Sequence, residues 1–258
     1  MIQITQVSTI NELTVLVSQL DELVGAPAPN RLRWWFRGHL SADWDLLPSV
    51  KRGYTAEQER FLSNEFYARA GTRYTRCPSK SNFAGWLTLM QHYGLPTRLL
   101  DWTGSPLTAA YFATEHCLHG ETHEAASDSC IWAIAPAQLN KSQGLEPYLY
   151  PLDAISLETI VIPAFKGTDS TDEIVAAMAV ENDPRIRAQQ GAFTVHSSNN
   201  PLNTLSSCEE WLVKIVIPRE FTESLCQEIR SLGVQRSILF PDLTNLAEEL
   251  KTDIRPGE

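Results

Sequence analysis

The chain has 258 residues, of which 43% are hydrophobic, a composition typical of a globular protein rather than a disordered or fibrous one. Its formal net charge of −10, from 31 acidic and 21 basic residues, argues against a broad surface for duplex nucleic acid. There is no run of eighteen apolar residues, no signal-peptide pattern at the N-terminus, and no regular spacing among the five cysteines. We therefore expect a cytoplasmic protein with no membrane contact and with reduced cysteines.

The first half of the chain is predicted to be mainly helical. Capping boxes, in which a Thr is followed three residues later by Glu or Gln, mark two helix starts at Thr9 and Thr55. Apolar residues then recur at helical spacing and predict helices within 1–28, after Thr55 and over 83–90. Between the first two helices, the aromatic run at 34–36 predicts a buried strand.

A short strand over 97–102 is followed by a helix with Ser105 as its N-cap and Pro106 at its first position. The second half then carries short β-rich runs, at 131–136, 159–165, 192–196 and 211–218, and two closing helices, within 221–232 and 243–250. Helices early and strands late predict an α+β fold. Because no repeat or linker divides the chain, we expect a single domain over 1–258, with an N-terminal helix within 1–28 and a core over 30–250.

One arginine and one glycine end the aromatic strand, in the run WWFRGH that contains Phe36, Arg37 and Gly38. A cation where a strand leaves the core is suited to an anionic ligand, although an arginine beside aromatic rings commonly only stacks on them. A second block, QHYGLPTRLLDWTGSPLTAAYFA at 91–113, concentrates groups that work together at ligand sites. These groups are His92, Tyr93, Thr97, Arg98, Asp101, Thr103 and Ser105.

The helix that begins at Ser105 exposes unpaired N–H groups beside hydroxyls, which favours an anion site. The alternative is that Ser105 only caps the helix, while Arg98 and Asp101 pair with each other. A third block, RIRAQQGAFTVH at 185–196, has two glutamines before a glycine that would let the backbone approach a ligand. The alternative interpretation of this block is a purely structural turn that leads into an edge strand.

Other signals are weaker. His116, Cys117, His119 and His123 are too irregularly spaced for zinc, so we expect no metal. P-loop, G-x-G-x-x-G and G-x-S-x-G motifs are missing from the sequence, which disfavours ordinary kinases, dehydrogenases and serine hydrolases. Two clusters of basic residues are either solvated surface or a local basic patch. They are Arg31, Arg33, Arg37, Lys51 and Arg52, and then Arg69, Arg73, Arg76 and Lys80.

Five motifs occur in order along the chain: FRG at 36–38, QHYGLPTRLLDWT at 91–103, SPLTAAYFA at 105–113, QQGAF at 189–193 and SILFPDLTNLAEEL at 237–250. Together they resemble the FRG domain, a family named after its Phe-Arg-Gly motif. A more distant resemblance is to ADP-ribosyltransferases of the arginine-serine-glutamate type. FRG looks like their first-strand aromatic-Arg-Gly motif, and DWT with the Ala and Phe residues after it looks like their second, Ser/Thr-rich motif.

This resemblance implies an ADP-ribosyltransferase-like fold, with helices mainly in the N-terminal half packed on a mixed, mostly antiparallel split sheet. It also implies NAD as the substrate. The catalytic residues would be Arg37, His92, Asp101 and Gln190. The residues in contact with NAD would be Phe36, Arg37, Gly38, His92, Tyr93, Thr97, Arg98, Thr103, Ser105, Gln189 and Phe193.

The third motif departs from that family, because Gln189 or Gln190 stands where a catalytic glutamate is expected. Glutamine can hydrogen-bond a ribose hydroxyl but supplies no negative charge. Either another carboxylate serves, with Asp101, Glu181 and Glu210 as candidates, or the domain binds a nucleotide without turning it over.

Three functions follow as hypotheses. The leading one is an NAD-using ADP-ribosyltransferase or NAD glycohydrolase, a toxin or antiphage defence effector with a protein or nucleic-acid acceptor. The second is a non-catalytic module that senses a nucleotide or binds a protein. The third is nucleic-acid processing, with the basic residues of 31–80 along a strand-binding groove.

Overall fold

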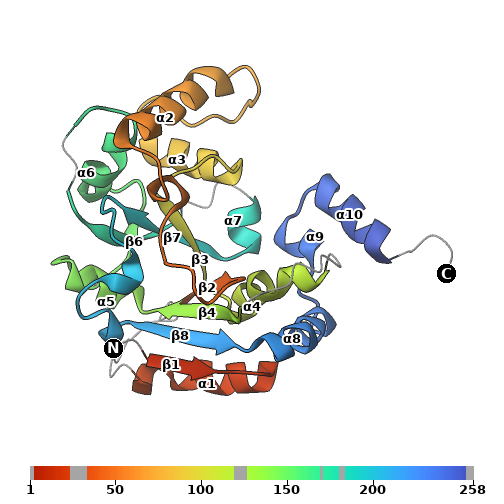
Figure 1. Cartoon of the computed structure of the whole chain (residues 1–258). Helices are drawn as coiled ribbons and strands as arrows, with labels where there is room; N and C mark the ends of the chain where they lie inside the picture. The colour runs from red at the N-terminus through yellow and green to blue at the C-terminus, as the bar shows by residue number, and fades with distance from the viewer. Residues whose placement is uncertain (1–2, 24–33, 119–126, 169–170, 180–183, 254–258) are drawn as a thin grey trace.

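Figure 1 presents the computed structural model, which describes residues 3–23, 34–118, 127–168, 171–179 and 184–253. These residues form one eight-stranded sheet with helices packed on it, so the predicted α+β class is confirmed. The strand order is β1-β8-β4-β2-β3-β7-β6-β5. The strands are β1 (Gln3–Gln6), β2 (Trp35–His39), β3 (Leu99–Thr103), β4 (Ser129–Ile134), β5 (Tyr150–Pro151), β6 (Ile174–Met178), β7 (Gly191–His196) and β8 (Leu212–Ile217).

The sheet is mixed and mostly antiparallel, as predicted: only β1 with β8 and β5 with β6 pair in parallel among the described strands. Its middle is thin, because β2 and β3 share a single residue pair, Phe36 with Thr103. By contrast, β2 pairs with β4 along its whole length, from Trp35 to His39. We call β1-β8-β4-β2 the first half-sheet and β3-β7-β6-β5 the second. The described strands thus form one open sheet whose two halves meet at a single residue pair.

The prediction that helices lie mainly in the N-terminal half is wrong, because α5 to α10 all follow residue 135. The helices are α1 (Ile10–Leu23), α2 (Ala56–Ala70), α3 (Phe83–His92), α4 (Pro106–Thr114), α5 (Pro136–Ser142), α6 (Glu158–Val161), α7 (Pro184–Ala188), α8 (Arg219–Ser231), α9 (Arg236–Leu239) and α10 (Leu243–Asp253). In Figure 1, α2, α3 and α6 lie beside the second half-sheet, while α4 and α8 lie with the first. None of the described helices combines the length and the apolar character needed to cross a bilayer.

The β-rich run at 159–165 is also helical, as α6 followed by a 3₁₀ turn (Ile162–Ala164). Besides Pro163, its buried residues are Ile160 and Ala164, and Val161 and Phe165, two pairs each spaced four apart, which is a helical spacing. A second difference lies at the N-terminus, where β1 precedes the predicted helix and pairs with β8. Residues 24–28 of that prediction lie outside the described part of the chain.

Capping residues fix the helices that border the site. Thr55 and Gln58 form the predicted capping box at α2. Ser105 accepts a hydrogen bond from the Thr108 N–H at the start of α4, and Pro106 occupies the first helical position.

Gly38 then sets how close α4 comes to β2. A Cβ atom at this position would lie 2.0 Å from the Ala109 carbonyl oxygen and 2.5 Å from the Ala113 nitrogen, so only glycine fits under the helix.

Two hydrophobic clusters form the core. The first joins β2, β4, β8 and α4 and includes Trp35, Ile131 and Ala109. The second joins α3 and α6 to one face of the second half-sheet and includes Leu87 and Ile160. The other face of the second half-sheet, which includes Leu100 and Ala176, belongs to the first cluster, so the two clusters lie on opposite faces of this half-sheet.

Candidate functional site

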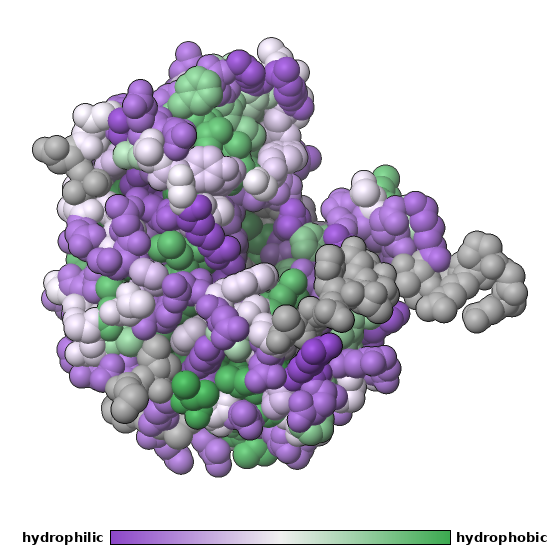
Figure 2. Space-filling view, viewed as in Figure 1, coloured by the Kyte–Doolittle hydropathy of each residue, from purple (hydrophilic) through white to green (hydrophobic). Residues whose placement is uncertain are grey.

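A cavity of about 370 Å³ opens where the half-sheets part, a volume within the range of about 300–1,000 Å³ typical of small-molecule sites. Figure 2 shows the surface hollowed in this region, with hydrophobic side chains at its floor. All five motifs contribute to the lining. They supply Phe36, Arg37 and Gly38, then Gln91, His92, Asp101, Trp102 and Thr103, then Phe112, then Gln189 and Phe193, and finally Phe240. Segments far apart in the sequence therefore meet at one place.

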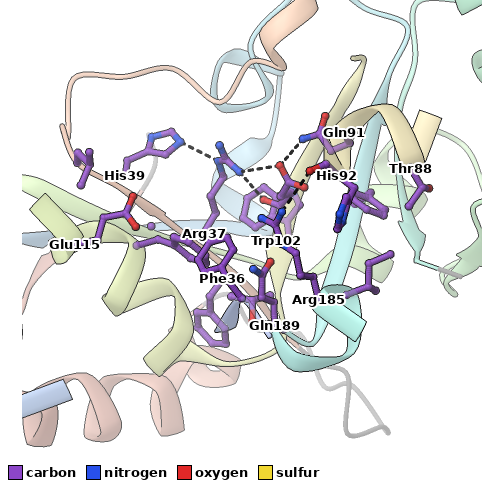
Figure 3. A pocket seen from close by; sticks show the side chains of 18 of the residues that line it. Phe36, Arg37, His39, Thr88, Gln91, His92, Trp102, Glu115, Arg185 and Gln189 are labelled. Atoms are coloured by element: carbon purple, nitrogen blue, oxygen red, sulfur yellow. Dashed lines mark hydrogen bonds and ion pairs between the residues drawn. The ribbon is translucent and has the colours of Figure 1, made fainter. Parts of the chain in front are cut away.

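Arg37 spans the gap between the half-sheets (Figure 3). Its Nη1 donates a hydrogen bond of 2.7 Å to the backbone carbonyl oxygen of Asp101 on β3, and Nη1 lies 3.9 Å from the Asp101 carboxylate. Its Nε donates to Nε2 of His39 at 3.0 Å. These two hydrogen bonds use two of the five N–H donors of a guanidinium, and the side chain is 22% exposed. Arg37 is thus fixed in direction while part of it still faces the cavity.

His39 is the fixed acceptor behind this arginine. The residue is 3% exposed, and burial, followed by the charge of Arg37, lowers the pKa of its imidazole to about 3. The ring is therefore neutral at physiological pH and can accept the Arg37 hydrogen bond at Nε2. Burial also lowers the pKa of Arg37 while Asp101 raises it, and a guanidinium stays charged under both influences.

Asp101 is oriented by a chain of hydrogen bonds that starts at Thr97. The Thr97 hydroxyl donates to Oε1 of Gln91 at 2.5 Å, and Nε2 of Gln91 donates to Oδ2 of Asp101 at 2.5 Å. Thr97 is buried and does not line the cavity, so it acts on the site through Gln91. The two residues therefore hold one carboxylate beside Arg37.

Further charged side chains line the cavity. Arg185 lies over the Phe240 ring at 4.4 Å and donates to the His92 carbonyl oxygen at 3.3 Å. Arg52 donates through Nε to the Leu47 carbonyl oxygen. Among the described lining residues, three arginines face two carboxylates, those of Asp101 and Glu115. The aromatic lining consists of Phe36, Trp44, Trp102, Phe112, Phe193 and Phe240. Cationic and aromatic walls together suit an anionic ligand that carries a flat ring.

The structure brings Arg37, His92 and Asp101 together but leaves Gln190 out. Gln190 has a positive φ of 48°, is exposed, and lies against Gly104 outside the cavity. Its neighbour Gln189 lines the cavity instead and donates through Nε2 to the Leu239 carbonyl oxygen.

Arg98, Ser105 and Tyr93 also lie outside the cavity. Arg98 is buried and forms a double hydrogen bond with Glu59, both at 2.7 Å, so the alternative pairing of Arg98 with Asp101 is wrong. Ser105 caps α4, and Tyr93 is exposed. Gly191 pairs with Thr103 in the sheet, so its immediate role is in strand pairing.

Some predicted residues cannot be placed. Arg31, Arg33, His119, His123 and Glu181 lie outside the described residues. Glu210 is exposed on a 3₁₀ turn and does not line the cavity. Within the described part of the chain, no group of three or more His, Cys, Asp or Glu side chains is placed to hold a metal ion.

Sequence reasoning missed several lining residues as site residues, namely His39, Trp44, Arg52, Thr88, Gln91, Glu115, Arg185, Ile186 and Phe240. Glu115 had a readable signal, because it follows Phe112 by three residues and so shares its side of the helix. The sequence also carried a signal for His39, because residues two apart on a strand, such as Arg37 and His39, point to the same face of the sheet. Trp44 and Arg52 lie in a loop, where no periodic signal exists.

Residues 32–122 match the family model of the FRG domain, so the resemblance to this family is confirmed for that stretch. The match covers the first three motifs and ends before QQGAF and SILFPDLTNLAEEL, which the structure brings to the same cavity. Comparison with curated proteins and with solved structures found no match.

Proposed function

We propose that the cavity binds NAD and that the chain is an NAD-using ADP-ribosyltransferase-like enzyme, which passes ADP-ribose to an acceptor or to water. The observation that carries this proposal is the convergence of all five motifs on one cavity, with Arg37 held at its centre. NAD has an anionic pyrophosphate for the arginines and two flat rings for the aromatic walls.

In the proposed reaction, the bond between C1′ of the nicotinamide ribose and the nicotinamide nitrogen breaks. Nicotinamide leaves as a neutral molecule with the bonding electron pair, and positive charge builds on the ribose. An acceptor nitrogen or oxygen, or water, forms the new bond to C1′ and gives its proton to a carboxylate or to solvent. A preorganised carboxylate stabilises this developing charge.

Glu115 is our candidate for that carboxylate. It lines the cavity from the 3₁₀ turn that continues α4, whereas the glutamine region of the third motif offers no negative charge. Asp101 is already bonded to Gln91 and adjoins Arg37, which suits it to positioning the arginine. We therefore expect Glu115→Gln to retain NAD binding and to lose nicotinamide release by about tenfold or more.

The test measures NAD binding by calorimetry and nicotinamide release by chromatography. Arg37→Ala should weaken NAD binding by about tenfold or more, because hydrogen bonds to charged groups contribute about 1.5–3 kcal/mol. Arg37→Lys should fall between Arg37→Ala and the unchanged protein, since lysine retains the charge and loses the planar donor geometry.

The matched control for the charge change is Arg219→Ala, an exposed arginine at the start of α8 that does not line the cavity. It should bind NAD normally. Absence of NAD binding at millimolar concentration, or full activity in Arg37→Ala, would overturn the proposal.

A non-catalytic nucleotide-binding module is the second candidate. It is favoured by the hydrogen bond from Gln91 to Oδ2 of Asp101 and by the Arg37 guanidinium 3.9 Å from the same oxygen, since both disfavour protonation of this carboxylate. This candidate predicts NAD binding that depends on Arg37 without nicotinamide release from the unchanged protein.

A further inference from the structure

A second cavity of about 160 Å³ adjoins the first along α3. Thr88 and His92 line both cavities, and they lie one helical turn apart on the same side of α3. In Figure 3, Thr88 lies beyond His92 as seen from Arg37. The second cavity thus continues the first along α3, on the side away from the hydrogen bond between Arg37 and Asp101.

The surroundings of this second cavity are basic in an acidic protein. No Asp or Glu occurs between Glu65 and Asp101, although the chain as a whole has 31 acidic residues among 258. The same stretch carries exposed Arg69, Arg73, Arg76 and Lys80. Arg76 itself lines the second cavity, and none of its described lining residues is acidic. An anionic group would meet no repulsion there.

An exposed aromatic ring contacts two of the residues that line this cavity. Tyr93 follows α3 directly and is 56% exposed. Its ring makes edge contacts with Tyr74, at 6.0 Å between centroids, and with His92, at 4.7 Å. Both of these neighbours line the second cavity. Tyr93 is thus one ring contact away from a cavity that Arg76 lines. Exposed aromatic rings on a basic surface are the combination with which proteins hold single-stranded nucleic acid, because every base has a face that stacks.

We propose that the second cavity is a binding site for single-stranded nucleic acid, with a phosphate at Arg76 and a base on Tyr93. A neighbouring nucleotide would then reach the first cavity past Thr88 and His92. The part of the inference that makes nucleic acid the ADP-ribose acceptor rests on the proposed function, whereas the binding site itself does not. A duplex is disfavoured, because the chain outside this stretch is strongly acidic.

The experiment measures fluorescence anisotropy of labelled twelve-nucleotide DNA and RNA single strands and of the matching DNA duplex, without NAD. We expect the single strands to bind more tightly than the duplex, with an affinity that falls as salt rises. Tyr93→Ala should weaken binding by about fivefold or more, since base stacking contributes about 1–3 kcal/mol for each base. Arg76→Ala should weaken it by a similar factor, because a charged contact with a phosphate is lost.

The chain offers matched controls for both substitutions. Tyr148 is exposed to 55% and lines neither cavity, so Tyr148→Ala controls for the loss of an exposed ring. Arg219→Ala controls for the loss of one positive charge. Both controls should bind like the unchanged protein. No binding at low salt, a preference for duplex, or equal losses in the controls would overturn the inference.

A second arm separates this inference from the proposed function. The protein is incubated with labelled NAD and the same single strands, and the label is traced on the nucleic acid. Strands that bind through Arg76 and Tyr93 without acquiring label would support the binding site and count against transfer to nucleic acid. NAD turnover together with no strand binding would retain the proposed function and reject the nucleic-acid site.

Discussion

At the scale of single residues, the charged guanidinium of Arg37 is held in place by the uncharged imidazole of His39. Arg37 donates to His39, whose pKa of about 3 keeps the ring neutral throughout the physiological range. A protonated histidine at this position would repel the guanidinium and could not accept its hydrogen bond. The support of Arg37 is therefore insensitive to pH where the protein works.

The same burial makes stability depend on pH. His39 and His196 both have pKa values lowered to about 3 by burial, whereas an unfolded histidine titrates near 6.5. Below pH 6.5 the unfolded chain takes up protons that the folded protein takes up only near pH 3. Stability is thus present above pH 6.5 and is lost as the pH falls toward 3, by about 1.4 kcal/mol per pH unit for each histidine.

We expect the free energy of unfolding in urea to fall steeply between pH 6.5 and 4.5, and more gently in His39→Gln. Glutamine retains an acceptor for Arg37 but takes up no proton in the unfolded state, so about half of the two-histidine contribution should disappear. Equal slopes in both proteins would contradict this assignment.

Residue types and motifs predicted a good part of the site. Arg37, His92 and Asp101 were placed in one site because each stands in an unusual motif, and they line one cavity. The choice between Gln189 and Gln190 could not be made from the sequence, because it depends on the positive φ that turns Gln190 outward.

At the scale of elements, local signals predicted the elements that border the site. Caps predicted the starts of α2 and α4, and short β-rich runs predicted β7 and β8. The predicted strand at 159–165 is wrong, because its β-branched residues favour a strand whereas the buried residues of the run follow helical spacing. Here tertiary packing overrode local preference.

Gly38 has a structural role that is separate from ligand binding, because it sets the distance between α4 and β2. Its neighbour Arg37 lines the cavity, while Gly38 lets the backbone of α4 lie against β2. We expect Gly38→Ala to lower the free energy of unfolding by about 1–3 kcal/mol, because the added methyl group must push α4 away. Urea denaturation measures this loss.

Gly71→Ala is the matched control, since a Cβ at Gly71 meets nothing within 4 Å and the residue has an ordinary φ of −60°. It should stay within about 0.5 kcal/mol of the unchanged protein. A similar stability for both variants would show that α4 can move without cost.

At the scale of the whole molecule, the site lies between two half-sheets that are joined in the sheet by a single residue pair. A ligand in the cavity contacts both halves and should restrain them together. We expect bound NAD to slow amide hydrogen exchange in β2 and in β3, and to raise the free energy of unfolding by about 2.7 kcal/mol at one hundred times its Kd. Slower exchange in only one half-sheet would contradict binding across the gap.

Local sequence patterns could not predict that distant segments of the chain meet at one cavity. Phe240 comes from the end of the chain and packs between Arg185 and Arg236, with its ring edge on Phe112. No local pattern relates residues so far apart. Only the ordered motifs of a known family indicated that these segments belong together.

Arg37 also joins the two half-sheets. Only one residue pair connects β2 and β3, and the hydrogen bond from Arg37 to the Asp101 carbonyl oxygen adds a second connection between the same strands. Gly38 in the same motif admits the backbone of α4 against β2, so the fold alone would require both residues. The presence of Phe-Arg-Gly in a sequence is therefore evidence about folding and is not by itself evidence of catalysis.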